Sequence, residues 1–423
     1  MTPNAVMDPA AVAPGDALPR VYLVQLGARR NYELLRLLAG GAEVVRFATS
    51  TAWEEGSPNT LFRSLVAKRR PGVALRRTIA GLARGRLLAA PLADFAFALA
   101  RLAGRPMQSR RAFASWVLGR AVRRDGWHGA EVLFTVDGNG GPAMIEAARQ
   151  AGLKVVSDFV VTPKAFHRMR EEDLRWPGFT RRKLSEGDVR RFEAGYRRLA
   201  QLSDLMICPS ETVIDGIRDI APEAVGRCVM VPYGLSGHRI RAGEPVAGRV
   251  LFAGSDATRK GLPYLGLAAT RLKALGCNTE VRVAGGFPNF VREQPECRDL
   301  VFLGHLDRRT MEQEYQKADV FCLPSLAEGS ASVVLEAMAA GVPCVVTRSV
   351  GSTVVNGCEG LLVPERDADA LAAAIRGIVE DRELRARMSQ AALQRAANHG
   401  VDRLAPELTA KIAAIARQAD VLR

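Results

Sequence analysis

The pattern of hydrophobic and polar residues along the chain alternates between two kinds of segment. One is a short apolar run, and the other is a longer stretch with an apolar residue every three to four positions. The short runs are typical of strands buried on both faces of a parallel sheet, and the longer stretches are typical of helices that pack on such a sheet. The runs occupy residues 20–26, 43–47, 131–136, 154–158, 249–253, 279–284, 320–323, 343–347 and 360–363. Repeated strand–helix units predict an α/β protein built on parallel sheets with helices on both faces.

A polar stretch that contains Gly and Pro, residues 235–248, interrupts this series of units and is typical of a linker. We therefore expect a first domain over residues 20–238, a second over 239–403, and a separate helix in 404–423. Residues 1–19 are rich in Ala and Pro and lack the pattern of a signal peptide, so we expect a disordered tail. No uncharged apolar run approaches the roughly 18 residues that a membrane-spanning helix needs.

The stretch 324–343 (PSLAEGSASVVLEAMAAGVP) joins a predicted strand to a predicted helix and carries two carboxylates, Glu328 and Glu336. Its small residues form a loop whose backbone a ligand can approach closely, and Ser330 or Ser332 is expected to be the N-cap of the helix. Free N–H groups at a helix start bind anions such as phosphate, and carboxylates accept hydrogen bonds from sugar hydroxyls. On spacing alone, a solvated Glu328 and a Glu336 that caps a turn fit the pattern as well.

Several further segments change that balance. The stretch resembles the E-x7-E segment of the retaining glycosyltransferases of family 4, a large group with the GT-B fold. Segments similar to other motifs of this family follow in the family's order, at residues 231–234 (VPYG), 252–254 (FAG), 259–261 (RKG), 300–306 (LVFLGHL) and 356–364 (NGCEGLLVP). The resemblance implies two Rossmann-like domains with doubly wound parallel sheets, a cleft between the domains, and a C-terminal helix that packs back on the first domain. It is weak before residue 130.

The resemblance implies that the second domain binds a nucleotide-sugar donor, a hexose linked to UDP or GDP. Lys260 and Arg259 would stabilise the charge of the departing diphosphate. Glu328 would bind the donor sugar, and Glu336 would bind the ribose hydroxyls. The catalytic residues expected on this basis are Lys260, Arg259 and Glu328. The other donor-binding residues that the motifs imply are Gly254, Ser255, His305, Leu306, Gly329, Ser330, Ala331, Ser332 and Val333.

Loops at the carboxyl ends of the first domain's strands are expected to face the acceptor, because ligands of doubly wound sheets bind at this edge. The acceptor-side residues that we expect are Gly27, Arg29, Arg30, Asp137, Asn139 and Thr162. The sequence departs from the family at two places. Many relatives have an Arg at the position of Ser255 as a second phosphate ligand, and often a His near the position of Thr162, beside the reacting sugar.

The resemblance implies a retaining hexosyltransferase that acts on a glycan, a lipid-linked glycan or a small-molecule acceptor. The departures at Ser255 and Thr162 leave a second hypothesis open, a catalytically silent protein of the same fold that binds a sugar nucleotide or a lipid. A sugar-nucleotide epimerase of the same fold is disfavoured by the RKG segment together with the E-x7-E segment.

Neither a cofactor nor a metal ion is expected. The five His are isolated from one another and from the Cys, and the seven Cys contain no C-x-x-C spacing. Scattered Cys in apolar segments are typical of buried free thiols in a reducing cytoplasm. Asp367 and Asp369 resemble the D-x-D metal motif of another glycosyltransferase fold, GT-A, but their place after Pro364 predicts a helix N-cap instead.

The formal net charge of +14 is concentrated in one segment. Residues 61–124 contain 15 Arg and Lys and a single acid, Asp94, with apolar residues between them. We expect a basic helical insert here. It suits an anionic membrane surface, an anionic substrate or simple solvation, whereas the scarcity of aromatic residues argues against nucleic acid as a partner. We therefore predict a cytoplasmic protein bound peripherally to the inner face of the plasma membrane. The apolar side chains expected to enter the bilayer interface are Leu87, Leu88, Phe95, Phe97 and Leu99.

Overall fold

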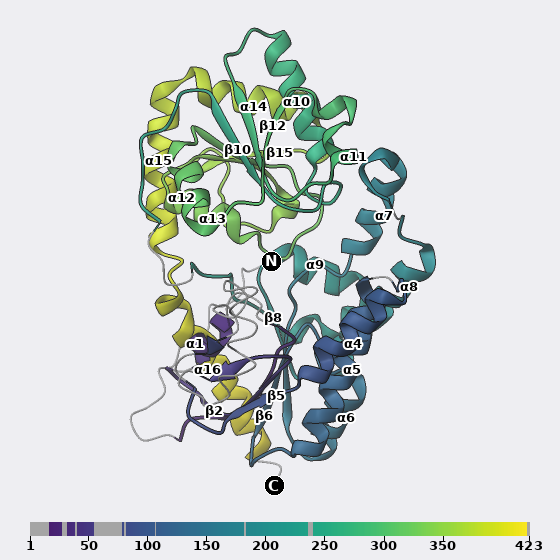
Figure 1. The fold of residues 1–423 in the computed structure, drawn as a ribbon. Coiled ribbons are helices and arrows are strands. Elements are labelled where there is room, and N and C mark those ends of the chain that lie inside the picture. The colour runs from purple at the N-terminus through teal and green to yellow at the C-terminus, as the bar shows by residue number, and fades with distance from the viewer. Residues whose placement is uncertain are drawn as a thin grey trace.

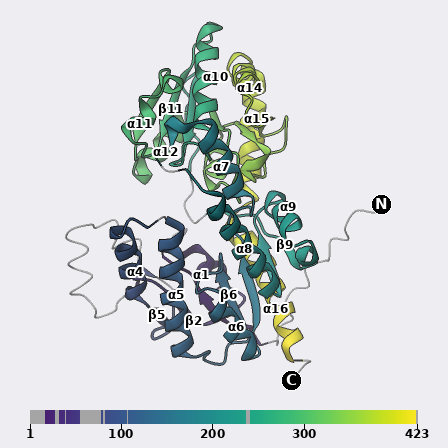
Figure 2. The same ribbon diagram turned by 90° about the vertical axis from the view of Figure 1, so that its right-hand side faces the viewer.

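In the computed structural model the chain forms two α/β domains, one above the other in Figure 1. The structure describes residues 17–27, 32–38, 40–54, 78–79, 82–105, 107–181, 183–235 and 240–420. Each domain contains one large parallel sheet with helices packed against it, and Figure 2 shows α7 and α8 at the side where the domains meet. The predicted α/β fold with two doubly wound sheets is confirmed.

The first domain is built on a seven-stranded sheet with the order β5-β2-β1-β6-β7-β8-β9. Its strands are β1 (Arg20–Val24), β2 (Glu43–Thr49), β5 (Leu87–Ala89), β6 (Val132–Val136), β7 (Lys154–Asp158), β8 (Leu205–Cys208) and β9 (Cys228–Met230). Its helices are α1 (Glu33–Leu38), α4 (Pro91–Leu102), α5 (Met107–Asp125), α6 (Pro142–Gln150), α7 (Ala165–Arg175), α8 (Glu186–Leu202) and α9 (Glu211–Ile220), with 3-10 turns η2 (Pro177–Phe179) and η3 (Pro222–Arg227). A separate pair, β3 (Trp53–Glu54) and β4 (Thr78–Ile79), lies outside this sheet.

The second domain is built on a six-stranded sheet with the order β12-β11-β10-β13-β14-β15. Its strands are β10 (Arg249–Ala253), β11 (Glu280–Ala284), β12 (Leu300–Gly304), β13 (Val320–Leu323), β14 (Cys344–Thr347) and β15 (Gly360–Val363). Its helices are α10 (Leu262–Ala274), α11 (Asn289–Arg292), α12 (Arg308–Lys317), α13 (Ser332–Ala339), α14 (Ala368–Glu380) and α15 (Arg382–Ala397), with 3-10 turns η4 (Pro295–Cys297) and η5 (Arg348–Val350).

The central strands are apolar throughout because both of their faces are covered. Every residue of β6 and of β13 is buried. In the second sheet, β10 and β13 are neighbours at the position where the strand order reverses. Doubly wound sheets bind ligands at the carboxyl ends of the strands at this position. We therefore expect a ligand-binding site at the loops that follow these two strands.

The last helix, α16 (Val401–Asp420), returns to the first domain, as the resemblance implied. Its residues Leu408, Ile412 and Ala416 are buried in the same apolar cluster as α1 and the strands β1 and β6. Figure 1 shows this helix in yellow running down beside α1, below the second domain. The chain thus crosses between the domains twice, after β9 and before α16.

The basic segment 61–124, which we expected to be helical, contains strands among its described residues. β5 pairs in parallel with β2 and forms one edge of the first sheet, so Leu87 and Leu88 belong to this sheet and are half-buried. A three-residue strand held mainly by backbone pairing has no periodicity that sequence analysis can detect. Residues 61–77 and 80–81, and residues 1–16 of the predicted tail, lie outside the described residues.

Candidate active site

A cluster of charged side chains lies where the loop after β10 meets the loop after β13. Lys260 Nζ lies 2.8 Å from Glu328 Oε1, and Arg259 forms an ion pair with the same carboxylate. The side chains of Glu328 and Lys260 are only 11% and 12% exposed. The structure therefore brings together the three residues that we predicted to be catalytic, with one buried carboxylate between two cations.

The electrostatics of this cluster follow from burial and charge together. Burial alone would raise the pKa of the Glu328 carboxyl, but the positive charges of Lys260 and Arg259 hold it below its usual value. Burial lowers the pKa of the Lys260 ammonium, and the attraction of Glu328 offsets only part of this effect. Because Glu328 is ionised at neutral pH, an incoming anion such as a phosphate would compete with it for both cations.

A glycine allows the two loops to touch. Gly261 has φ +73°, in the left-handed region, and a Cβ at this position would lie 2.1 Å from the carbonyl oxygen of Pro324. The Leu326 N–H donates to the carbonyl oxygen of Arg259 at 2.9 Å across the same contact. A side chain at residue 261 would push the loops apart, which explains why Gly follows the two basic residues.

Glu336 lies in α13, and its partner was not predicted from the sequence. The hydroxyl of Tyr315, a fully buried residue of α12, donates to Glu336 Oε2 at 2.9 Å. Burial raises the pKa of the Glu336 carboxyl, and the hydrogen bond from Tyr315 opposes this rise. The sequence pattern marks Tyr315 only as a core residue of an amphipathic helix, so its role in holding Glu336 becomes visible only in three dimensions.

The start of α13 differs from the prediction. The N-cap residue is Ala331, and no side chain caps the helix, so the prediction that Ser330 or Ser332 is the capping residue is wrong. The loop is held by its backbone instead, since the Ala331 N–H donates to the carbonyl oxygen of Val350 at 3.2 Å. Ser330, Ser332 and Val333 are partly exposed at the helix start, where free N–H groups can face a ligand.

The first domain contacts this loop directly. The Thr162 N–H donates to the carbonyl oxygen of Glu328 at 3.4 Å, and the Ser210 hydroxyl donates to the carbonyl oxygen of Gly329 at 2.5 Å. A Cβ at Gly329 would lie 2.1 Å from the carbonyl oxygen of Val160. Thr162 is buried at this contact, so the loop after β7, predicted to face the acceptor, and the loop after β13, predicted to bind the donor, lie together at the domain boundary.

The other residues that were predicted to face the acceptor lie at the carboxyl ends of β1 and β6. Asn139 Oδ1 accepts a hydrogen bond from the Leu26 N–H at 2.7 Å, which joins the loops after these two strands. Asp137, with φ +54°, accepts a hydrogen bond from Tyr196 of α8, and Gly27 has φ +75° in the loop after β1. Arg29 and Arg30 lie outside the described residues.

The remaining residues that were predicted to bind the donor lie around the carboxyl edge of the second sheet. Gly254 follows β10, and a Cβ there would lie 3.2 Å from Lys260 Cγ, while His305 and Leu306 follow β12. Ser255 is exposed and lines a cavity of about 330 Å³ between the domains. Other residues around this cavity include Met107 of α5, Met169 and Asp173 of α7, Asp188 of α8, and Phe287 and Phe290 after β11.

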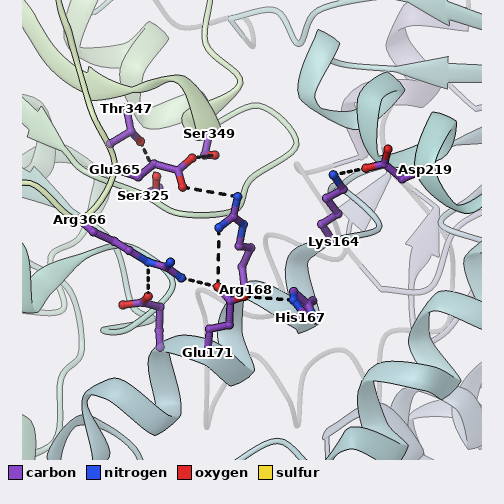
Figure 3. A network of polar contacts seen from close by, with 11 residues as sticks. Lys164, His167, Arg168, Glu171, Asp219, Ser325, Thr347, Ser349, Glu365 and Arg366 are labelled. Carbon is purple, nitrogen blue, oxygen red and sulfur yellow. Dashed lines mark hydrogen bonds and ion pairs between the residues drawn. The ribbon is translucent and has the colours of Figure 1, made fainter.

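A polar network fixes α7 of the first domain against the second domain (Figure 3). Arg366 forms ion pairs with Glu171 and with the fully buried Glu172, and Arg168 lies 3.8 Å from Glu365. The Tyr264 hydroxyl donates to Glu172 at 2.7 Å. Because α7 follows the loop that carries Thr162, these contacts hold that loop against the second domain.

The structure also describes other residues that the sequence analysis named. Asp367 accepts a hydrogen bond from the Ala370 N–H at 2.8 Å and is the N-cap of α14, as predicted. All seven cysteines are free, and Cys358 is exposed rather than buried. Within the described residues, no group of three or more His, Cys, Asp or Glu side chains is arranged to hold a metal ion. None of the described helices is both long and apolar enough to cross a membrane.

Comparison with known proteins identifies the domain that carries this cluster. Residues 244–395 match the family model described as glycosyl transferases group 1. The second domain belongs to this family. A 152-residue stretch is 41% identical to phosphatidyl-myo-inositol mannosyltransferase of Mycolicibacterium smegmatis, and the match covers 34% of the chain and 39% of that protein. A match to glycogen synthase of Mycobacterium tuberculosis is 30% identical and covers 47% of the chain and 50% of that protein. The chain thus matches half or less of the length of these two relatives.

Solved structures show the same fold over nearly the whole chain. Sucrose-phosphate synthase from Thermosynechococcus elongatus has a TM-score of 0.62 at 18% identity, with 96% of this chain and 100% of that chain covered. WaaG, a glycosyltransferase involved in lipopolysaccharide biosynthesis, has a TM-score of 0.58 at 15% identity, with 93% and 99% covered. Together with the strand orders and the crossing of α16, these likenesses establish the GT-B architecture.

Proposed function

We propose that the protein is a retaining glycosyltransferase that transfers a hexose from a nucleotide-sugar donor to a glycan, lipid-linked or small-molecule acceptor. The observation that carries this proposal is the buried cluster of Lys260, Arg259 and Glu328 inside a glycosyl transferases group 1 domain, at the boundary with the first domain. The solved structure of HepE from Anabaena, in complex with UDP and glucose, has the same fold and supports a nucleotide-sugar donor. The departures at Ser255 and Thr162 do not remove this cluster.

In the proposed reaction the bond between the sugar's anomeric carbon and the diphosphate breaks, and a bond from that carbon to the acceptor oxygen forms on the same face. The acceptor's proton passes to the departing phosphate oxygen. Lys260 and Arg259 would exchange Glu328 for the phosphate and neutralise its growing charge, so that two fixed cations supply the charge that a metal ion supplies elsewhere. Glu328, freed from part of its pairing, would accept hydrogen bonds from the sugar hydroxyls, and the enzyme would act mainly by positioning.

We also propose that the acceptor is presented at an anionic membrane surface and that the protein is cytoplasmic and binds peripherally to the inner leaflet. This proposal is supported by the excess of Arg and Lys in residues 61–124, because each basic residue near an anionic surface contributes about 1 kcal/mol to binding. The similar mannosyltransferase of Mycolicibacterium smegmatis is named for phosphatidyl-myo-inositol, which is consistent with a lipid-linked acceptor here.

The proposed function is tested by incubating the purified protein with UDP- and GDP-linked hexoses, with and without candidate acceptors. We expect release of nucleoside diphosphate that depends on the acceptor and persists in EDTA, and a product whose anomeric configuration matches the donor's by NMR. Donor binding without turnover across the panel would instead support the silent binding protein. Inverted anomeric configuration or loss of turnover in EDTA would overturn the retaining or the metal-free part of the proposal.

Tyr315→Phe is expected to weaken binding of the nucleoside diphosphate by about ten- to a hundredfold at neutral pH, because a hydrogen bond to a charged group is worth about 1.5–3 kcal/mol. Ribose hydroxyls need the Glu336 carboxylate as acceptor, so affinity should fall as pH drops through the raised pKa of Glu336. Since the Tyr315 hydrogen bond lowers this pKa, its removal should move the loss of affinity to a higher pH. Calorimetric titrations over a pH series measure both effects.

Tyr264→Phe is the matched control, because the buried Tyr264 hydroxyl also donates to a glutamate, Glu172 in α7 of the first domain, which lies away from the cluster. It should leave the pH profile of nucleotide binding unchanged. If both variants shift the profile equally, or if Tyr315→Phe shifts it to lower pH, Tyr315 does not position Glu336 for the nucleotide.

A further inference from the structure

The helical hairpin of α4 and α5 presents its large apolar side chains outward and its small ones inward. On α4, Ala93, Ala96 and Ala100 are buried, whereas Leu92, Phe95 and Leu102 are 69%, 65% and 85% exposed, and Leu99 on the same stripe is also exposed. This spacing of i, i+3, i+7 and i+10 places the large residues on one side of the helix. A helix that only covers a sheet would have the reverse arrangement.

The second helix continues the exposed apolar surface. Phe113 and Trp116 of α5 are exposed and stack on each other with ring centroids 6.0 Å apart, and the Arg120 guanidinium lies 5.2 Å from the Trp116 ring centroid. Ala114, Leu118 and Val122 of the same helix are buried on the opposite side. Seven of the sixteen large hydrophobic side chains exposed among the described residues lie in this one hairpin: Leu92, Phe95, Leu99, Leu102, Met107, Phe113 and Trp116.

The charges on the hairpin are of one sign. Seven arginines and no acid occur between Asp94 and Asp125, namely Arg101, Arg105, Arg110, Arg111, Arg120, Arg123 and Arg124. Both flanking acids are engaged with the first domain, since Asp94 accepts a hydrogen bond from the Thr51 N–H and Asp125 is paired with Arg46. None of the seven arginines forms an ion pair with an acid of the described residues, so their charge is available to an anionic partner.

We infer that the outer face of the α4–α5 hairpin, defined by the exposed apolar residues above and the arginines beside them, docks into an anionic lipid bilayer. An exposed apolar surface of this kind marks an interaction site, and unpaired arginines around it select a negatively charged partner. A bilayer with anionic headgroups offers both complements, because arginines meet the headgroups while the apolar side chains enter the acyl boundary. Phe95 and Leu99, named in the sequence analysis, lie on this face, whereas Leu87, Leu88 and Phe97 are half-buried and do not belong to it.

This inference rests on the proposed function only for the role of the docking, which is to hold the protein beside a membrane-borne acceptor. It corrects the set of apolar side chains expected from the sequence, because the docking face consists of those that the fold leaves exposed. The hairpin also has a place relative to the site, because Met107 at the start of α5 lines the cavity that Ser255 borders. A bilayer docked on the hairpin would therefore lie beside the boundary between the domains.

The test is co-sedimentation of the full chain with phosphatidylcholine vesicles that do or do not contain anionic phosphatidylglycerol. The wild type should bind the anionic vesicles, lose binding as salt rises, and show a blue shift of tryptophan fluorescence that Trp116→Phe abolishes. Phe95→Ser with Leu99→Ser and Leu102→Ser should lower partitioning at least tenfold. Arg120→Gln with Arg123→Gln and Arg124→Gln should lower it about a hundredfold.

Leu275→Ser with Val301→Ser is the matched control, because these exposed apolar residues lie on the second domain. It should leave partitioning unchanged, and circular dichroism should show all variants folded. Equal binding by the hairpin variants and the wild type, or no binding to anionic vesicles at low salt, would overturn the inference. So would a dimer in solution that the hairpin substitutions dissociate while vesicle binding persists.

The two proposals fail separately. Turnover of a soluble acceptor analogue without vesicle binding would reject the docking surface and leave the glycosyltransferase proposal intact. Vesicle binding through the hairpin without donor turnover would reject the enzyme and leave the docking surface intact.

Discussion

Lys260→Ala is expected to lower kcat by about 100- to 1,000-fold, the usual effect of removing one group that stabilises charge in a transition state, or about 2.7–4 kcal/mol. Lys260 is one of the two cations that pair with the Glu328 carboxylate. Because the Lys260 side chain is buried, its charge interacts with a nearby anion more strongly than it would in water. The leaving diphosphate would lose half of its fixed positive charge. Turnover is measured as release of nucleoside diphosphate at saturating donor and acceptor.

The fold should survive this substitution, because Glu328 keeps its ion pair with Arg259. Lys273→Ala is the control, since this exposed lysine is paired with Asp299 at the surface and should leave turnover unchanged. A folded Lys260→Ala protein that keeps more than a third of wild-type kcat would show that Lys260 is not a phosphate ligand. Lys260→Arg should restore part of the loss, because it returns the charge with a different shape.

The second domain was predictable from its sequence to within a residue or two at most element ends. The bounds of β10, β13 and β15 agree with the predicted runs, because each apolar run is followed directly by a Gly or a Pro that acts locally. The same local rules failed at α13, where the backbone of Val350 rather than a serine side chain holds the helix start. A contact between residues distant in sequence had replaced a local cap.

The residues of the candidate site could be predicted from the sequence, but the ion pairs and hydrogen bonds between them could not. Arg259, Lys260 and Glu328 could be named from motifs, but their mutual pairing depends on the close approach of two loops at Gly261. Tyr315 carries no motif, and it acquires its role only when α12 packs beside α13. On the hairpin, the sequence showed the excess of arginine but not which apolar side chains face outward, since that depends on where the sheet lies.

Asp319→Ala is expected to destabilise the second domain by about 3–5 kcal/mol, the cost of breaking a buried ion pair by removing one partner. Asp319 is fully buried just before β13, and its carboxylate accepts hydrogen bonds from Arg382 at 2.6 and 2.9 Å and from the Gly248 N–H at 2.9 Å. Arg385 lies 3.0 Å away and is itself largely buried. Removal of the carboxylate leaves a buried guanidinium without its partner and the Gly248 N–H without its acceptor.

The effect should reach the candidate site, because Asp319 fixes the start of the strand that leads to the Glu328 loop. Urea unfolding followed by circular dichroism should show a midpoint lowered in proportion. Glu380→Ala removes an exposed Arg376 partner in the same domain and should cost less than about 0.5 kcal/mol, as surface pairs do. The loss of stability in Asp319→Asn should lie between those of Asp319→Ala and Glu380→Ala, since the amide oxygen still accepts one hydrogen bond but carries no charge. If the free energy of unfolding of Asp319→Ala lies within about 1 kcal/mol of the wild-type value, the buried ion pair does not hold β13 in place. The geometry of the Glu328 loop would then depend on the contacts at Gly261 and Gly329 instead.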